Sequence, residues 1–152
     1  ATLPVGDFPT IEEAQADFDK AVETLNEARK NKPEDEVKLA VSNAKRAGFV
    51  LGNATRTADG PMAMPVQAMR IGPAALVAIP VEAFCEIGIA VKGASPAEQT
   101  LFSGYTNGYM GYMPMADNFE EGGYEVVTTP MAAGAAEETI DVCTDAVQAL
   151  WR

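Results

Sequence analysis

The chain has 152 residues, 47 % of them hydrophobic, which is the size and composition of one compact domain and excludes wholesale disorder. It carries 22 acidic and 11 basic side chains, a formal net charge of -11, which argues against nucleic acid as a partner because phosphate binding requires clustered Lys and Arg. No apolar run approaches the roughly 20 residues that span a bilayer, and the N-terminus lacks the pattern of a signal peptide. We therefore expect a soluble chain, from which a signal could already have been removed.

Histidine is absent from the sequence, which removes the usual general base near neutral pH and the commonest zinc ligand. The two cysteines, Cys85 and Cys143, lie in apolar helical patterns. This placement favours two buried thiols over a disulfide or a nucleophile, and it leaves the cellular compartment open. Any hydrolytic chemistry carried by this chain alone must therefore do without imidazole.

The sequence pattern of residues 1–56 predicts a helical hairpin. Thr10 and Glu13 have the spacing of a capping box, and apolar residues then recur every three or four positions up to about Asn31. Pro33 interrupts the pattern, and the acidic residues after it favour the N-terminus of a second helix. The apolar positions are Ile11, Ala14, Phe18, Ala21, Leu25 and Ala28 in the first helix and Val37, Val41, Ala44, Gly48 and Leu51 in the second.

Strands and helices are mixed in the rest of the chain, residues 57–152. An extended strand is expected over 61–72 with its prolines near a sheet edge, and a strand covered on both faces over 74–80. A helix is expected over about 82–91, and a further strand over 99–105.

The C-terminal third continues this mixture. After an irregular loop, a strand is expected over 124–130 and a terminal helix over about 136–150. The predicted fold class is α/β or α+β, with an N-terminal helical hairpin followed by mixed strands and helices packed on a sheet. Two independent domains divided near residue 56 are the less favoured arrangement, because each piece is small.

The segment 107–125 reads NGYMGYMPMADNFEEGGYE and holds three of the chain's four tyrosines. Glycines and Pro114 make its backbone irregular, and loops of this kind often carry functional groups. The tyrosine hydroxyls of such a loop are available to bind a ligand or a neighbouring group. Each tyrosine could equally be a half-buried aromatic whose hydroxyl is satisfied locally. The four are Tyr105, Tyr109, Tyr112 and Tyr124.

Glu82 follows the buried strand at the expected start of a helix, a position where α/β proteins often gather ligand-binding groups. The helix dipole also favours a carboxylate there, so Glu82 could be a helix N-terminal acid with no further role. Glu86 lies one turn further along the same expected helix. This spacing allows metal-free acid-base hydrolysis by the two carboxylates as another possibility.

Three stretches, ALVAIPVEAFCEIG, TNGYMGYMP and EEGGYE, occur here in an order that resembles the last part of the catalytic domain of the neutral ceramidases and their bacterial homologues. The resemblance covers the sequence from about Pro61 to Arg152, whereas for the N-terminal hairpin only the layout is similar. Family members usually have Pro-Gly-Glu where this chain has Pro80-Val81-Glu82. The resemblance implies that residues 1–152 are the C-terminal portion of a ceramidase-like catalytic domain.

The resemblance also implies a zinc site. The family's zinc is held by two histidines, a glutamate and the second tyrosine of an Asn-x-Tyr-x-x-Tyr motif, and the last two correspond here to Glu82 and Tyr112. A later tyrosine, followed by glutamate, donates a hydrogen bond to the oxyanion, and Tyr124 stands in that place before Glu125. Such enzymes cleave the N-acyl bond of ceramide with a zinc-activated water.

Without histidine the chain alone would carry an incomplete, inactive site for the Zn²⁺ cofactor. The resemblance therefore implies a partner that supplies two His ligands, either an N-terminal portion of the same enzyme or another chain. It implies an N-acyl lipid or other amide as substrate and a secreted or periplasmic location, without nucleic acid or a transmembrane segment. The alternative is a non-catalytic binding module that retains the fold. Four residues could line an apolar substrate groove or belong to the core: Met110, Met113, Met115 and Phe119.

Overall fold

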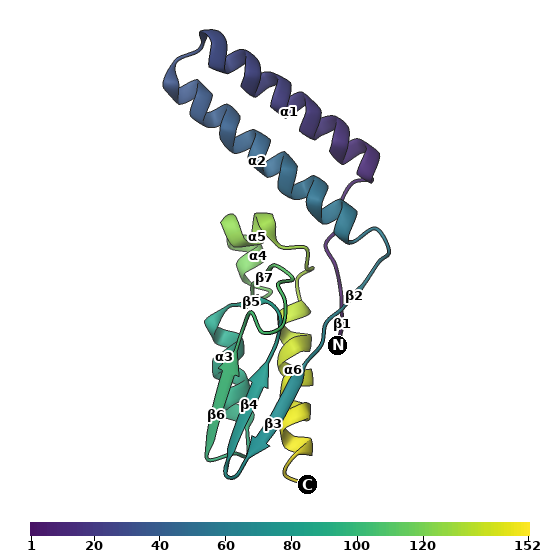
Figure 1. Cartoon of the computed structure of the whole chain (residues 1–152), viewed down its shortest axis with the longest axis vertical. Helices are drawn as coiled ribbons and strands as arrows, with labels where there is room; N and C mark the ends of the chain where they lie inside the picture. The colour runs from purple at the N-terminus through teal and green to yellow at the C-terminus, as the bar shows by residue number, and fades with distance from the viewer. The chain divides into compact units, whose positions relative to one another are not determined.

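The computed structural model describes all 152 residues and confirms an α/β chain with an N-terminal pair of helices (Figure 1). It divides into two compact units, one of residues 7–59 and the other of residues 1–6 and 60–152. The chain length predicts one compact domain instead. The difference arises because each unit buries an apolar cluster of its own.

The unit of residues 7–59 is the predicted hairpin, with helices α1 (Ile11–Asn31) and α2 (Glu34–Arg56). The capping box forms: the Thr10 hydroxyl accepts the N–H of Glu13 at 3.2 Å, and the Glu13 carboxylate accepts the N–H of Thr10 at 3.0 Å. Pro33 is the N-cap of α2. Small side chains let the two helices approach closely, and the buried cluster between them contains Leu25, Ala28, Ala40 and Ala44.

The other unit is built on a three-stranded sheet of order β3 (Gln67–Ile71), β4 (Ala74–Ala78) and β6 (Gln99–Ser103). Strands β3 and β4 form an antiparallel hairpin around Gly72, whose φ of 59° suits glycine. Strand β4 pairs with β6 in parallel through the crossover helix α3 (Cys85–Ala94).

The expected strand over 61–72 is divided. Pro65 has no N–H to donate, and it separates β3 from the short strand β2 (Met62–Ala63). Strand β2 pairs with β1 (Thr2–Leu3), an element that the sequence pattern did not predict. The side chain of Leu3 is fully buried, so the first residues of the chain complete this unit's core.

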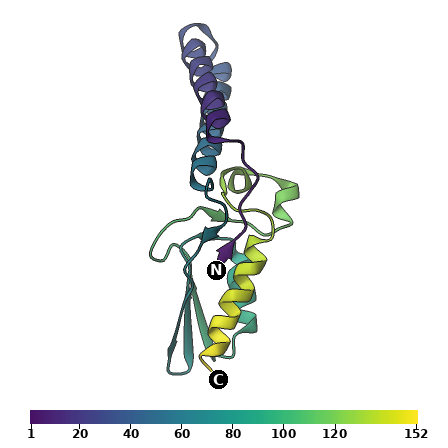
Figure 2. The ribbon, with the colours of Figure 1, turned by 90° about the vertical axis from the view of Figure 1, so that its right-hand side faces the viewer.

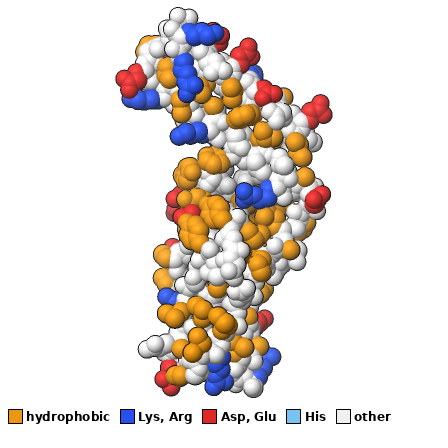
Figure 3. Space-filling model, in the orientation of Figure 1, with side chains coloured by type: hydrophobic (Ala, Val, Ile, Leu, Met, Phe, Trp, Pro, Cys, Tyr) orange, Lys and Arg blue, Asp and Glu red, His pale blue; other side chains and the backbone are white.

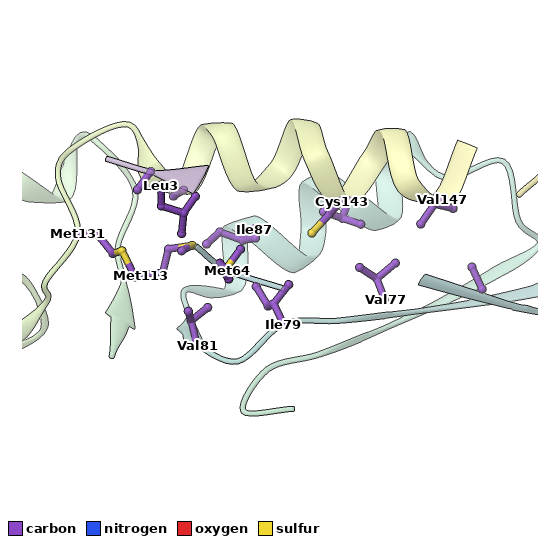
Figure 4. Packing of buried hydrophobic residues seen from close by; sticks show 14 residues of the cluster. Leu3, Met64, Val77, Ile79, Val81, Ile87, Met113, Met131, Cys143 and Val147 are labelled. Carbon is purple, nitrogen blue, oxygen red and sulfur yellow. The ribbon is translucent and has the colours of Figure 1, made fainter. Parts of the chain in front are cut away.

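Helices α3 and α6 (Ala135–Ala149) lie on the same face of the sheet (Figure 2). The core between them and the strands contains Val77, Ile87 and Val147, all fully buried (Figure 4). At Gly88 of α3, an added Cβ would lie 3.2 Å from the Phe102 ring, so glycine allows close packing of this helix on β6. The terminal helix follows the sequence prediction closely.

The other face of the sheet is uncovered within this unit. Met69, Leu76 and Leu101 are aligned across the three strands, and Met69 and Leu101 are 51 % and 63 % exposed. Figure 3 shows hydrophobic side chains gathered on the lower part of this surface, over the sheet. Strand β4 is therefore not covered on both faces as the apolar run predicted, because no second layer packs against this side.

The expected strand over 124–130 is wrong. Those residues begin with the short helix α5 (Tyr124–Thr128), preceded by α4 (Asn118–Glu121). The β-branched run favours a strand, but the Thr128 hydroxyl bonds the Tyr124 carbonyl at 2.9 Å and the Thr129 N–H donates to Glu125 O at 3.0 Å. Local bonds thus override the propensity.

Both cysteines are free, but only one matches the expectation of a buried thiol. Cys143 is fully buried on α6, whereas Cys85 is exposed at the first position of α3. The Cys85 thiol donates to the Glu86 carboxylate at 3.3 Å. No helix combines the length and apolar character required to cross a membrane.

Candidate functional site

Glu82 and Tyr112 are partners in a parallel pair of two-residue strands, β5 (Glu82–Ala83) and β7 (Tyr112–Met113). The Glu82 N–H donates to Gly111 O at 3.0 Å, and the Phe84 N–H donates to Met113 O at 3.2 Å. Opposed residues on neighbouring strands project from the same face of a sheet. The carboxylate and the phenol therefore leave the backbone on one side, next to each other.

Glu82 does not occupy the helix start that the sequence predicted. Its backbone pairs with β7, and α3 begins only at Cys85. The strand pairing satisfies the backbone groups that a helix would otherwise use. Glu82 is thus not the N-terminal acid of a helix, and Glu86 does not follow it on the same helix, which removes the premise of a metal-free carboxylate pair.

The segment that leads into Glu82 accepts backbone hydrogen bonds from the loop of residues 104–111, which carries Tyr105 and Tyr109. Tyr105 N–H donates to Val81 O at 3.0 Å, and Met110 N–H donates to Pro80 O at 2.7 Å. Gly104 is required at this crossing, because an added Cβ would lie 2.9 Å from the Val81 carbonyl oxygen. The position of Glu82 is therefore set by the loop that also carries the tyrosines.

Unusual backbone angles mark this loop. Tyr105 has a φ of 54°, in the left-handed region that aromatic residues rarely adopt, and Asn107 has a φ of 61°, which asparagine adopts more readily. The Asn107 side-chain amide donates to Gln67 Oε1 at 3.0 Å and ties the loop to β3. Such strained conformations persist where surrounding contacts hold them, and they are common at functional sites.

Three of the four tyrosines interact with Glu82, and the fourth, Tyr124, contacts Tyr112. The Tyr109 hydroxyl donates to Glu82 Oε2 at 3.4 Å, a long hydrogen bond. Tyr105 and Tyr109 stack with ring centroids 5.5 Å apart and planes 7° apart. Tyr112 and Tyr124 meet edge to face at 5.9 Å and 80°. The Glu82 carboxylate thus lies beside three phenols.

Glu82 changes the acidity of these phenols. Its hydrogen bond with Tyr105, together with desolvation and its charge, raises the pKa of Tyr105 to about 12. Desolvation, followed by the charge of Glu82, raises the pKa of Tyr112. In the metal-free protein both phenols therefore hold their protons at neutral pH.

Tyr124 is the first residue of α5 and is 58 % exposed. Gly122 and Gly123 precede it with φ of 73° and 112°, which glycine adopts readily, and they let the chain turn in front of Tyr112. At the other end of α5, the buried Thr129 hydroxyl donates to Tyr112 O at 2.7 Å. This bond links the helix of Tyr124 to the strand of Tyr112.

The residues present fit part of a metal site. Carboxylate and phenol oxygens from Glu82 and Tyr112 are adjacent, and both can bind a divalent cation. No group of three or more His, Cys, Asp or Glu could hold a metal ion. The two oxygens would therefore supply only half of a four-coordinate shell.

The methionines near the loop belong to the core. Met113 is fully buried, and Met110 and Met115 pack against the same cluster. Met113 therefore has no exposed surface that could line a substrate groove.

Three interactions at the site are not predicted from the sequence. They are the interaction of Tyr105 with Glu82, the hydrogen bond from Asn107 to Gln67, and the hydrogen bond from the Thr129 hydroxyl to Tyr112 O. Each joins residues far apart along the chain. The only sequence signal is Gly104 directly before Tyr105, which indicates a close backbone approach at the end of a strand.

Solved structures of ceramidases resemble this chain. One is described as a neutral ceramidase from Pseudomonas aeruginosa, with 26 % identity and a TM-score of 0.53 over 60 % of this chain and 15 % of that one. Another, described as ceramidase complexed with C2, has 26 % identity and a TM-score of 0.52 over 57 % and 14 % of the two chains. No protein-family model matches the sequence, and no curated protein matches it either.

The predicted relationship to the neutral ceramidases is confirmed: the chain has a neutral ceramidase-like fold over the matched part. It spans about 15 % of the length of the first of these enzymes.

Proposed function

We propose that this chain is the part of a ceramidase-like zinc amidohydrolase that contributes Glu82 and Tyr112 as metal ligands and Tyr124 as the oxyanion donor. The observation that carries the proposal is the parallel pairing of Glu82 with Tyr112, which places a carboxylate and a phenol side by side. The likeness to solved neutral ceramidases supports the same choice of chemistry.

When bound, zinc with an open position would supply an activated water for attack on an amide carbonyl. The Tyr112 phenol keeps its proton at Oη while no cation is present, because desolvation and Glu82 raise its pKa. A neighbouring cation favours the phenolate, so Tyr112 would give up that proton on binding. The Tyr124 phenol is exposed and can donate to an amide oxygen as negative charge develops there.

The remaining two ligands would come from outside these 152 residues. The sequence contains no histidine, and the chain spans only 15 % of the matched neutral ceramidase. The partner is a histidine-bearing portion of the same enzyme or a second chain. The substrate class is an N-acyl lipid or another amide, and the family resemblance favours a periplasmic or secreted location.

Amide hydrolysis by the complete protein, meaning these residues together with the histidine-bearing portion, tests the proposal. N-acyl lipids and simple amides are assayed side by side, before and after a chelator and again after Zn²⁺ is restored. Glu82→Gln should abolish turnover, and Glu86→Gln, the same change on α3, should retain it. Full activity of Glu82→Gln, or activity that the chelator leaves intact, would refute the assignment.

A second candidate is a non-catalytic binding module. The observation that favours it is the exposure of Tyr105, Tyr109 and Tyr124, between 53 % and 58 %, on a chain without a complete metal site. Exposed tyrosines are typical of contact surfaces. A complete protein that binds no zinc and hydrolyses no amide would favour this candidate.

A further inference from the structure

The stacked pair of Tyr105 and Tyr109 lies against Glu82 but has no role in the proposed chemistry. We propose that these two tyrosines are positioning residues that hold the Glu82 carboxylate in the orientation needed to share a cation with Tyr112. This inference rests on the proposed function above and extends it to the residues that support the ligand. Side chains that hold a metal ligand from behind commonly set its orientation and its affinity for the metal.

The geometry of the two rings carries the argument. Tyr109 donates to Glu82 Oε2 at 3.4 Å, and the Tyr105 ring stacks on Tyr109 at 5.5 Å with nearly parallel planes. A single long hydrogen bond would hold a carboxylate loosely. Stacking restricts both rings together, and Tyr105 also interacts with Glu82. An ionised carboxylate has about four acceptor sites, so it can accept from two phenols and still bind a cation.

The backbone holds this pair against the strand that carries Glu82. Tyr105 N–H donates to Val81 O at 3.0 Å, one residue before Glu82. Met110 N–H, directly after Tyr109, donates to Pro80 O at 2.7 Å. Both rings are therefore attached through backbone bonds to the segment whose side chain they contact, which fixes their distance from the carboxylate.

The left-handed backbone at Tyr105 supports a role for its side chain. A φ of 54° is adopted far more easily by glycine or asparagine than by an aromatic residue. Half of the ring is exposed, so core packing does not account for a tyrosine here. The stacking on Tyr109 and the interaction with Glu82 do account for it.

Zinc affinity of the complete protein, with Zn²⁺ as the probe, is the first test. Tyr105→Phe and Tyr109→Phe keep both rings and remove only the hydroxyls. We expect each variant to bind Zn²⁺ more weakly, and the double variant by about 10- to 100-fold, with unchanged thermal unfolding. Tyr124→Phe is the matched control, since the Tyr124 ring contacts Tyr112, and should bind Zn²⁺ like the unsubstituted protein.

A second test needs no metal. Ultraviolet resonance Raman spectra of the metal-free 152-residue chain report whether tyrosine hydroxyls donate to an anionic acceptor. Glu82→Ala should reduce that donor signature, and the reduction should be smaller in a chain that already carries both Phe substitutions. An unchanged signature in Glu82→Ala would overturn the positioning role whatever happens to zinc.

The outcomes separate the two claims. A complete protein whose zinc binding is lost in Glu82→Gln but unchanged in the double Phe variant retains the proposed function and loses the positioning role. A complete protein that binds no zinc in any form overturns both.

Discussion

Glu82 and Tyr112 are direct partners in the β5–β7 pair, although each of these strands contains only two residues. Two paired strands of this length are not stable without further contacts. It is held by the bonds from Tyr105 and Met110 to the segment before Glu82 and by the Thr129 hydroxyl on Tyr112. The candidate site therefore depends on the backbone of the loop as much as on the two side chains.

Tyr124→Phe should separate the chemical step from metal binding. If the Tyr124 hydroxyl donates to the amide oxygen in the transition state, its loss should lower kcat of the complete protein by about 10²- to 10³-fold. KM and zinc content should change little, because the ring remains against Tyr112. Steady-state kinetics with parallel metal analysis measures both, and a KM effect with normal kcat would assign Tyr124 to substrate binding instead.

Gly104→Ala should destabilise the unit that carries the site. The added Cβ would lie 2.9 Å from the Val81 carbonyl oxygen, which is backbone and cannot rotate away. We expect a loss of about 1–3 kcal/mol in the free energy of unfolding, measured with urea. Gly93→Ala is the matched control, because it lies in α3 with nothing within 4 Å of the added carbon, and should stabilise by roughly 0.5–1 kcal/mol.

The two faces of the sheet should respond differently to truncation. Val77 is fully buried under the helices, so Val77→Ala should cost roughly 1–3 kcal/mol through lost burial and a cavity. Leu101 is 63 % exposed on the opposite face, so Leu101→Ala should change the free energy of unfolding by less than about 0.5 kcal/mol. Equal losses in urea titrations of the 152-residue chain would mean that the outer face is covered in solution.

The titration of Tyr105 should depend on Glu82. The pKa of Tyr105 rises from the ordinary 10.0 to about 12, so in the folded chain this phenol ionises later than in the unfolded chain. The associated stability is complete below pH 10 and is lost as the pH rises toward 12.

Phenolate absorbance of the metal-free chain measures this shift. Glu82→Gln removes the negative charge beside the ring and should move the late part of the titration to lower pH. Glu86→Gln should leave the curve in place. A titration that is identical in all three proteins would show that Glu82 does not contact Tyr105 in solution.

Local patterns in the sequence predict helices α1, α2, α3 and α6 and strands β4 and β6. Thr10 and Glu13 form their cap, and the apolar spacing gives the hairpin and α6. The same kind of reasoning failed for residues 124–128, where β-branched side chains favour a strand but local hydrogen bonds form α5. Propensity is a weak guide where a segment is only one turn long.

The site was predictable only in part, and for a physical reason. The motifs identify Glu82 and Tyr112 as candidate metal ligands, yet the sequence predicts a helix at Glu82. Paired strands of only two residues, β5 and β7, leave no periodic pattern in the sequence. Tyr105 gave even less signal, since its relation to Glu82 arises from a left-handed turn and backbone bonds across the loop. Contacts of this kind depend on tertiary structure.

Zinc affinity of the complete protein in two single variants is the most direct measurement. If Glu82 and Tyr112 bind the same ion, Glu82→Gln and Tyr112→Phe should each weaken Zn²⁺ binding at least about 10-fold, whereas Glu86→Gln should bind like the unsubstituted protein. Competition against a chromogenic chelator provides the dissociation constants. Unchanged Zn²⁺ affinity in either Glu82→Gln or Tyr112→Phe would contradict a shared metal site.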